Sequence, residues 1–108
     1  MKHGLGEFEQ LVLLALVRLG TEAYGVAIRD EIEQRTGRNV ALGAVYTTLL
    51  RLEDKRLVAT RLGEPTPQRG GRRKKYYRPL VAGRRELAAS LEALRSMTRG
   101  LNPGFEAP

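Results

Sequence analysis

The residues with the clearest chemical potential are basic, and they are concentrated in one short segment. Six of the ten positions from 69 to 78 are lysine or arginine and none is acidic: Arg69, Arg72, Arg73, Lys74, Lys75 and Arg78. Guanidinium and ammonium groups at this density bind phosphate groups, because each supplies positive charge and hydrogen-bond donors. Tyr76 and Tyr77 stand inside the cluster. Aromatic residues here favour an ordered strand over the simpler alternative of a solvated basic loop.

The composition of the whole chain narrows the function classes. The 108 residues carry 19 Lys plus Arg against 12 Asp plus Glu, a net charge of +7. This excess predicts a polyanionic partner. Cysteine is absent and His3 is the only histidine, which excludes disulfides, thiolate zinc sites, thiol nucleophiles and His-rich metal sites. No nucleophile–base set or carboxylate pair stands out, so the sequence predicts no enzyme activity, cofactor or metal.

The length predicts one domain with a small core. The longest apolar run, Leu11–Val17, is too short to span a bilayer. No signal peptide precedes it. We therefore expect a soluble, cytoplasmic protein without a membrane partner.

Hydrophobic periodicity predicts three helices in the first half of the chain. They cover 7–19, which ends at Gly20; 24–36, with Thr21 as a candidate N-cap; and 42–55. Gly37 follows the second helix where a left-handed C-cap is usual, and 39–41 is either a very short strand or extended chain. Inward positions are predicted at Ala27, Ile28, Ile32, Val45, Leu49 and Leu52. Two short helices followed closely by a third outline a helix-turn-helix.

The third helix carries side chains that suit the edges of DNA bases. Arg51 has the fork geometry for guanine, and the methyl groups of Thr47 and Thr48 suit thymine. Alternatively the threonines are neutral surface and Tyr46, the fourth candidate, packs inside the domain. Tyr24 either donates a hydrogen bond to a phosphate or packs on a neighbouring hairpin.

The basic segment is predicted to lie on a β-hairpin. Strands are expected over 57–62 and 72–78, separated by 63–71, whose prolines and glycines break regular structure. Pro79 ends the second strand because proline cannot donate to a ladder. Strand alternation puts Arg73 and Lys75 on one face, with Arg72 and Lys74 on the other.

A last helix is predicted over 81–99, followed by a disordered tail over 102–108. The fold class is therefore mainly α, with α+β content. We expect a winged helix-turn-helix domain over 1–79 and a dimerisation helix over 80–101.

Two apolar surfaces predict a homodimer. The first helix is apolar nearly all round, so one of its sides needs a cover, which a chain this short can take from a second subunit. The last helix repeats apolar residues at heptad-type spacing. The predicted dimerisation residues are Leu13, Val17, Leu87, Leu91 and Leu94. For the last three, the alternative is packing against their own domain.

Three segments together resemble the PadR family of bacterial transcriptional regulators. They are LVLLALVRLGTEAYGVAIRDEIEQRTG, VALGAVYTTLLRLEDKRLV and GGRRKKYYRPLVAGRREL. The resemblance covers about 5–99 and implies a dimeric repressor of a palindromic operator, in the branch with a short C-terminal domain. The chain departs from the family pattern at Thr47, where members commonly carry proline, and at Leu80, which cannot cap the last helix as their threonine would.

These observations predict a DNA-binding transcriptional regulator: a homodimeric repressor that binds double-stranded DNA through the helix over 42–55 and a basic wing over 63–78. One alternative is a non-specific DNA- or RNA-binding module. Another is a winged-helix domain whose basic hairpin binds an acidic protein. Some relatives bind small molecules between subunits, so an effector at the dimer interface is a further expectation, although no residue carries it over.

Overall fold

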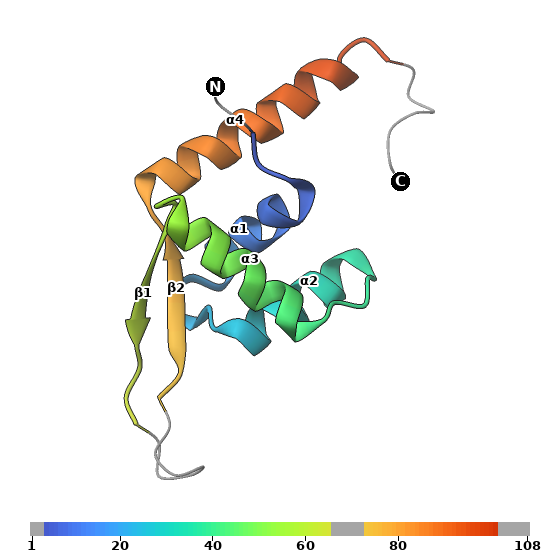
Figure 1. Cartoon of the computed structure of the whole chain (residues 1–108). Coiled ribbons are helices and arrows are strands. Elements are labelled where there is room, and N and C mark those ends of the chain that lie inside the picture. The colour runs from blue at the N-terminus through green and yellow to red at the C-terminus, as the bar shows by residue number, and fades with distance from the viewer. Residues whose placement is uncertain (1–3, 66–72, 102–108) are drawn as a thin grey trace.

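The computed structural model describes residues 4–65 and 73–101. Its elements follow the predicted order: α1 (Glu7–Leu19), the 3-10 turn η1 (Gly20–Glu22), α2 (Gly25–Thr36), α3 (Leu42–Asp54), β1 (Val58–Leu62), β2 (Lys75–Pro79) and α4 (Val81–Thr98). Figure 1 shows three helices gathered beside the hairpin, with α4 running across one end of the group. The predicted mainly helical α+β class is confirmed.

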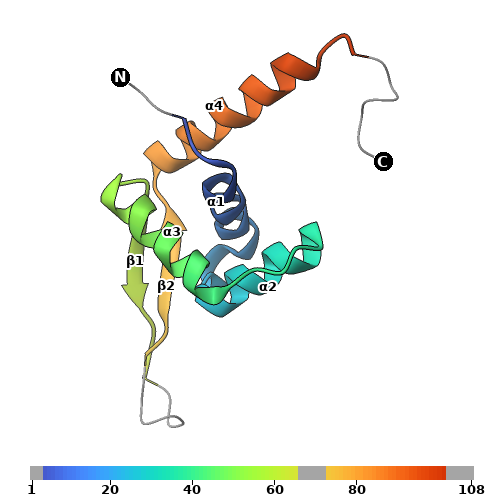
Figure 2. The same cartoon turned by 45° about the vertical axis from the view of Figure 1, so that its right-hand side comes forward.

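Helices α1, α2 and α3 surround the core (Figure 2). All three helices contribute fully buried side chains to it: Val12, Leu13, Leu16, Ile28, Val45, Leu49 and Leu52. The second apolar side of α1 contacts β2 and α4 of the same chain. The assignment of Leu13 to the dimer interface is therefore wrong, because its side chain is completely buried within its own chain.

The ends of the helices follow their capping residues, with one correction. Gly37 closes α2 in the left-handed conformation, as predicted (φ 74°). Thr21 is not the N-cap of α2: it lies in η1, and Tyr24 holds the N-cap position without a side-chain cap. The segment 39–41 is extended and forms no strand. Arg56 adopts φ 61° and turns the chain from α3 into β1.

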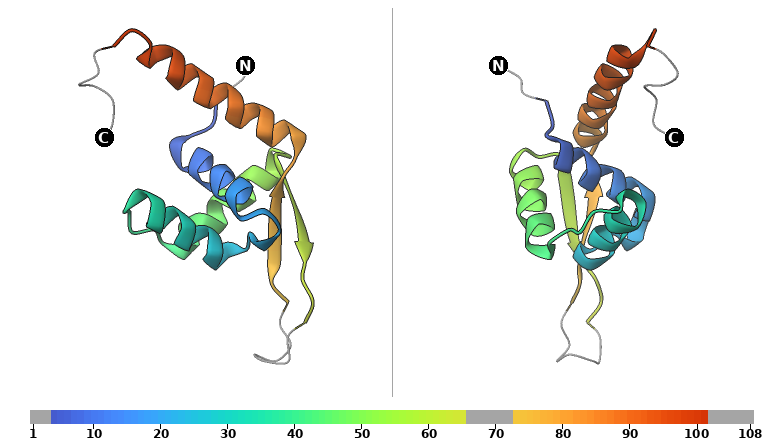
Figure 3. Two further views of the ribbon diagram at one scale, coloured as in Figure 1. Left: turned by 180° about the vertical axis from the view of Figure 1, so that it is seen from behind. Right: turned by 90° about the vertical axis from the view of Figure 1, so that its right-hand side faces the viewer.

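Strands β1 and β2, together with residues 73–74 before β2, are called the wing below. The two strands are antiparallel, with Val58 paired to Pro79 and Leu62 to Lys75. Tyr77 is buried on the inner face. Its amide donates to the carbonyl of Ala23 (2.9 Å), which ties the chain after η1 to the edge of β2. Figure 3, left, shows the end of α1 and η1 next to β2. Arg72, the predicted first strand residue, lies outside the described residues, and β2 begins at Lys75.

Helix α4 is fixed to the domain at its root. Leu80 is its N-cap and makes no side-chain cap bond, as predicted, but its amide donates to the Leu57 carbonyl (2.9 Å). Gly83 packs directly on that same carbonyl, where a Cβ atom would overlap it. Leu87 is 6% exposed and belongs to the core, and Leu91 packs against it. The assignment of Leu87 to a dimer interface is therefore wrong: it packs against its own domain.

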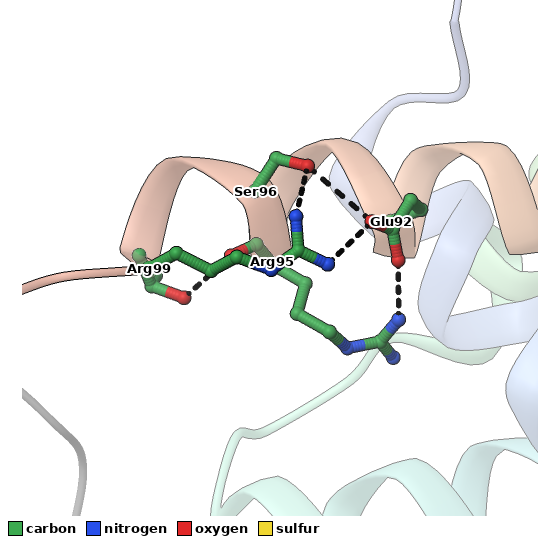
Figure 4. Close-up of polar contacts among 5 residues, drawn as sticks. Glu92, Arg95, Ser96 and Arg99 are labelled. Atoms are coloured by element: carbon green, nitrogen blue, oxygen red, sulfur yellow. Dashed lines mark hydrogen bonds and ion pairs between the residues drawn. The ribbon is translucent and has the colours of Figure 1, made fainter.

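The second half of α4 extends beyond the core (Figures 1 and 2). One side is polar: Glu92 accepts hydrogen bonds from Arg95 (2.7 Å) and Arg99 (2.7 Å), as Figure 4 shows. These bonds lower the pKa of Glu92 below its ordinary value, and the bond from Arg99 has the larger effect. The other side is apolar and exposed, with Leu94 and Met97 exposed by 58% and 77%. Leu101, just after the end of the helix, is 47% exposed.

A partly buried ion pair joins α1 to the end of α3. Glu9 accepts hydrogen bonds from the Gly6 amide (2.9 Å) and from Lys55 Nζ (2.9 Å). Burial raises the pKa of Glu9, but the bonds from Lys55 and Gly6 outweigh it, so the pKa lies below its ordinary value of 4.5. The predicted tail, 102–108, lies outside the described residues. Across 4–65 and 73–101, no helix is long and apolar enough to cross a membrane.

Candidate nucleic-acid interface

The exposed face of α3 begins the site. Tyr46, Thr47, Leu50 and Arg51 are all exposed, whereas Thr48 is 4% exposed and packs in the core. The prediction that Thr48 contacts DNA is therefore wrong. Leu50, 60% exposed, takes its place on this face and was missed. Helical spacing could have placed Thr48 inside, because it lies three residues after Val45 and four before Leu52 and so shares their face of the helix.

The phenol ring of Tyr46 lies across the start of α2. A Cβ atom at Gly25, the first residue of α2, would overlap the Tyr46 hydroxyl and ring. The absence of a side chain at Gly25 therefore leaves the space that the Tyr46 ring occupies. Tyr46 is 42% exposed, and its hydroxyl lies against Gly25 at the α2 N-terminus, whose N-cap residue makes no side-chain bond to the first turn.

Tyr24 connects α2 to the wing. It forms an isolated bridge with Tyr76 of β2, and the two rings meet edge to face with centroids 5.7 Å apart. Lys74 Nζ lies 4.1 Å from the centroid of the Tyr24 ring, within the range of a cation–π contact. Packing on the hairpin, one of the two roles predicted for Tyr24, is therefore present.

The other described cations of the wing are distributed over both faces of the hairpin. Arg61 of β1 stacks on Tyr76 at 4.3 Å and donates to the Thr21 carbonyl (2.9 Å). Lys75 lies on the opposite face of β2, with Nζ 5.7 Å from the Tyr77 ring, and Arg73 is exposed just before the strand. Burial raises the pKa of Tyr77, and nearby Glu53 raises it further. Arg72 lies outside the described residues.

Several acidic residues form ion pairs with arginines that lie outside α3 and the wing. Glu31 pairs with Arg18 and Arg35, and Glu7 pairs with Arg38. These bonds lower the pKa values of both carboxyl groups and raise the pKa of Arg38. Within the described ranges, no carboxylate pairs with the cations of α3 and the wing: Arg51, Arg73, Lys74 and Lys75. This face therefore keeps its positive charge for a partner. In the same part of the chain, no cluster of acidic or histidine side chains is arranged to hold a metal ion.

The sequence matches the model of the PadR-like family of transcriptional regulators over residues 13–89. The chain belongs to the PadR-like family. Members of this family are transcriptional regulators and not enzymes, and this chain is a DNA-binding transcriptional regulator. The predictions of a winged-helix fold and of a DNA-binding transcriptional regulator are therefore confirmed.

Solved structures of PadR-like regulators share the fold. A PadR family regulator from Eggerthella lenta DSM 2243 is 27% identical, with a TM-score of 0.66, and the match covers 94% of this chain and 88% of that one. A PadR family regulator from Clostridium difficile R20291 is 22% identical, with a TM-score of 0.69 and coverage of 85% and 92%. A transcriptional regulator from Clostridium thermocellum is 22% identical, with a TM-score of 0.72 and coverage of 91% and 89%. No curated protein sequence gives a significant match.

Gly25→Ala is expected to weaken DNA binding while leaving the fold intact. The new methyl group displaces the Tyr46 ring, which is the mobile end of a side chain and moves more easily than backbone. We expect the affinity for duplex DNA to fall about tenfold, which is the value of one charge-assisted hydrogen bond. The Tm should change little. Fluorescence anisotropy and thermal melting measure the two quantities. Unchanged affinity would show that the position of Tyr46 does not matter for binding.

Proposed function

We propose that the protein is a homodimeric repressor that binds a palindromic operator. The observation that carries the proposal is an exposed α3 beside a basic wing: Tyr46 of α3 lies against the start of α2, and the Lys74–Tyr24–Tyr76 stack fixes the start of α2 to the wing. An exposed helix fits the major groove, and a basic hairpin fixed beside it reaches the neighbouring backbone or minor groove. The stack supports a wing whose base is ordered before DNA arrives.

The exposed side chains of this surface take different roles in the proposal. Arg51 recognises guanine, and Thr47 and Leu50 contact thymine methyl groups. Tyr46 donates its hydroxyl to a phosphate that also accepts from the uncapped amides of α2. Arg73, Lys74 and Lys75 bind backbone phosphates along the wing.

A second copy of the chain is the proposed partner of α4. The apolar side of its second half projects past the core, opposite the hydrogen-bonded Glu92 network (Figure 4). Val17 of α1, which is 40% exposed, offers an apolar position to the α4 of the second copy. A two-fold arrangement of this kind makes the same contacts twice and places two α3 helices about 34 Å apart, or a multiple of that distance. Val17 and Leu94 are thus retained as interface residues, with Met97 and Leu101 added.

Selection of bound duplexes from a random pool tests the whole proposal. The expected result is an enriched palindrome whose half-sites are one or more helical turns apart, preferred over scrambled duplex by at least about 10³-fold at fixed salt. Enrichment without a motif would instead support a non-specific binding module. Repression is tested separately, by placing the selected palindrome across a promoter and measuring transcription with and without the protein.

The double variant Arg73→Ala/Lys74→Ala is expected to weaken binding to all duplexes without changing base preference. Loss of one or two phosphate contacts per protomer lowers the slope of log K against log salt by about 0.9 for each contact. A salt titration by anisotropy measures this slope. Arg85→Ala is the control, because it removes an exposed arginine from α4, which lies outside the proposed DNA-binding surface. Unchanged DNA affinity in the double variant would favour a wing that binds an acidic protein.

A further inference from the structure

The ring of Tyr76 in β2 is packed between groups from three places in the chain. Arg61 of β1 stacks on it with the guanidinium carbon 4.3 Å from the ring centroid, and the ring of Tyr24 meets it edge to face at 5.7 Å. A Cβ atom at Gly63, just after β1, would overlap the edge of the Tyr76 ring. The Tyr76 ring therefore gives Tyr24 a closely packed neighbour in the hairpin.

The backbone of Tyr24 is held from two sides. Tyr24 is the N-cap residue of α2, and its carbonyl accepts a hydrogen bond from the amide of Ile28 (2.9 Å). The Ile28 side chain is completely buried in the core. On the other side, an isolated bridge joins Tyr24 to Tyr76. The Tyr24 ring therefore has a defined position between α2 and the wing.

Lys74 lies directly on this ring. Its Nζ is 4.1 Å from the centroid of the Tyr24 ring, and its carbonyl accepts a hydrogen bond from the Gly63 amide (2.7 Å). Lys74 is exposed, and within the described residues no carboxylate pairs with it. An ammonium group carries three hydrogen-bond donors, so the group can rest on the ring and still donate to a phosphate oxygen.

We propose that Tyr24 is a positioning residue for DNA binding, whose ring holds the Lys74 ammonium group ready for a backbone phosphate. A lysine side chain has many rotamers, and fixing them when DNA binds lowers the affinity. The ring fixes them in advance. This role belongs to the aromatic ring and not to the phenol hydroxyl, which distinguishes it from a direct hydrogen bond between Tyr24 and phosphate. It rests on the proposed function, because it requires that Lys74 contacts DNA.

Two substitutions of Tyr24 separate the ring from the hydroxyl. Tyr24→Phe keeps a ring that still attracts a cation, so affinity for a random-sequence duplex should stay within about twofold of the parent value. Tyr24→Leu removes the ring and should weaken binding about fivefold, the cost of ordering one long side chain on binding. Anisotropy measures both affinities, and thermal melting checks that both variants are folded. Equal losses in the two variants would assign the role to the hydroxyl and overturn the proposal.

A double-mutant cycle shows whether Tyr24 acts through Lys74. In a Lys74→Ala protein, Tyr24→Leu should change the affinity by less than about twofold, because the group that the ring positions is gone. Lys75→Ala is the matched background, since Lys75 Nζ lies 5.7 Å from the Tyr77 ring on the opposite face of β2. There, Tyr24→Leu should keep its effect of about fivefold. Equal effects of Tyr24→Leu in the two backgrounds would indicate a general disturbance of the wing and overturn the proposal.

Failure of the proposed function would give a different result. If Lys74→Ala alone leaves the affinity for duplex DNA unchanged, the proposed DNA contact of the wing is wrong, and the role of Tyr24 is overturned with it. If Lys74→Ala weakens binding but Tyr24→Leu does not, the contact stands and only the positioning role is overturned.

NMR of the protein without DNA gives an independent signature. The ring current of Tyr24 should shift the ε-methylene protons of Lys74 upfield in the parent protein and in Tyr24→Phe, but not in Tyr24→Leu. The ε-methylene protons of Lys75 serve as the control and should not respond to Tyr24→Leu. Absence of the upfield shift for Lys74 in the parent protein would overturn the proposal.

Discussion

Leu94→Glu is expected to convert the protein into a monomer that binds a half-site normally but a palindrome at least about 100-fold more weakly. Linking two binding heads raises overall affinity by about 10²–10⁴ without any new contact, and the variant removes only that link. Leu94 is 58% exposed in the single chain, so the monomer tolerates a charge there. In a dimer the same carboxylate would be buried against apolar surface, which is strongly unfavourable.

Sedimentation and anisotropy measure the two effects of this change. Leu91→Glu, the substitution that the heptad spacing suggests, is less informative because Leu91 packs on its own core and its loss would also disturb the monomer. Ala89→Glu places the same charge at an exposed position on another side of α4 and serves as the control. A Leu94→Glu protein that still sediments as a dimer would contradict the proposed α4 interface.

Gly83→Ala is expected to destabilise the whole chain, although alanine normally favours a helix. The added methyl group meets the Leu57 carbonyl, which is backbone and cannot move aside as a side chain does. That carbonyl also accepts the Leu80 amide, so relief of the overlap breaks a hydrogen bond or shifts the root of α4. Overpacking of this kind costs about 1–3 kcal/mol, and we expect Tm to fall by about 5–20 °C.

The control for this change is another glycine in a helix. A Cβ atom at Gly43 of α3 would meet nothing within 4 Å. Gly43→Ala should therefore leave Tm unchanged or raise it slightly, because alanine restricts the unfolded chain more than glycine does. Thermal melting of both variants separates the two cases. Equal melting temperatures for Gly83→Ala and the parent protein would show that the contact with Leu57 is not tight.

The helices could be predicted from sequence because their signals are local. Apolar periodicity and the glycines at 20 and 37 mark the ends of α1 and α2, and the inward stripe of α3 follows from spacing alone. The cover of α1 could not be predicted in the same way. Its second apolar side indicated a partner subunit, but the chain's own α4 and β2 occupy much of it, and only the tertiary arrangement decides between these covers.

The candidate site was predictable in its location and less so in its detail. The basic wing and α3 were found from charge and order along the chain. The contact between Tyr46 and Gly25 and the ring pair of Tyr24 and Tyr76 join residues far apart in sequence, so no local pattern predicts them. The assignment of Thr48 failed for a different reason: a small polar residue suggests a surface position, whereas helical spacing puts it inside.

The seat of α4 on the Leu57 carbonyl also has a mechanical meaning. The 18 residues of α4 form a rod about 27 Å long at 1.5 Å per residue. Its root is clamped by the Gly83 contact and the Leu80 hydrogen bond. By simple leverage, a tilt of about ten degrees at the root would displace the far end of a rod of that length by about 5 Å. In the proposed dimer, the contact between Gly83 and the Leu57 carbonyl would limit this tilt. The stiffness of that contact would then determine how far the distance between the two α3 helices can vary.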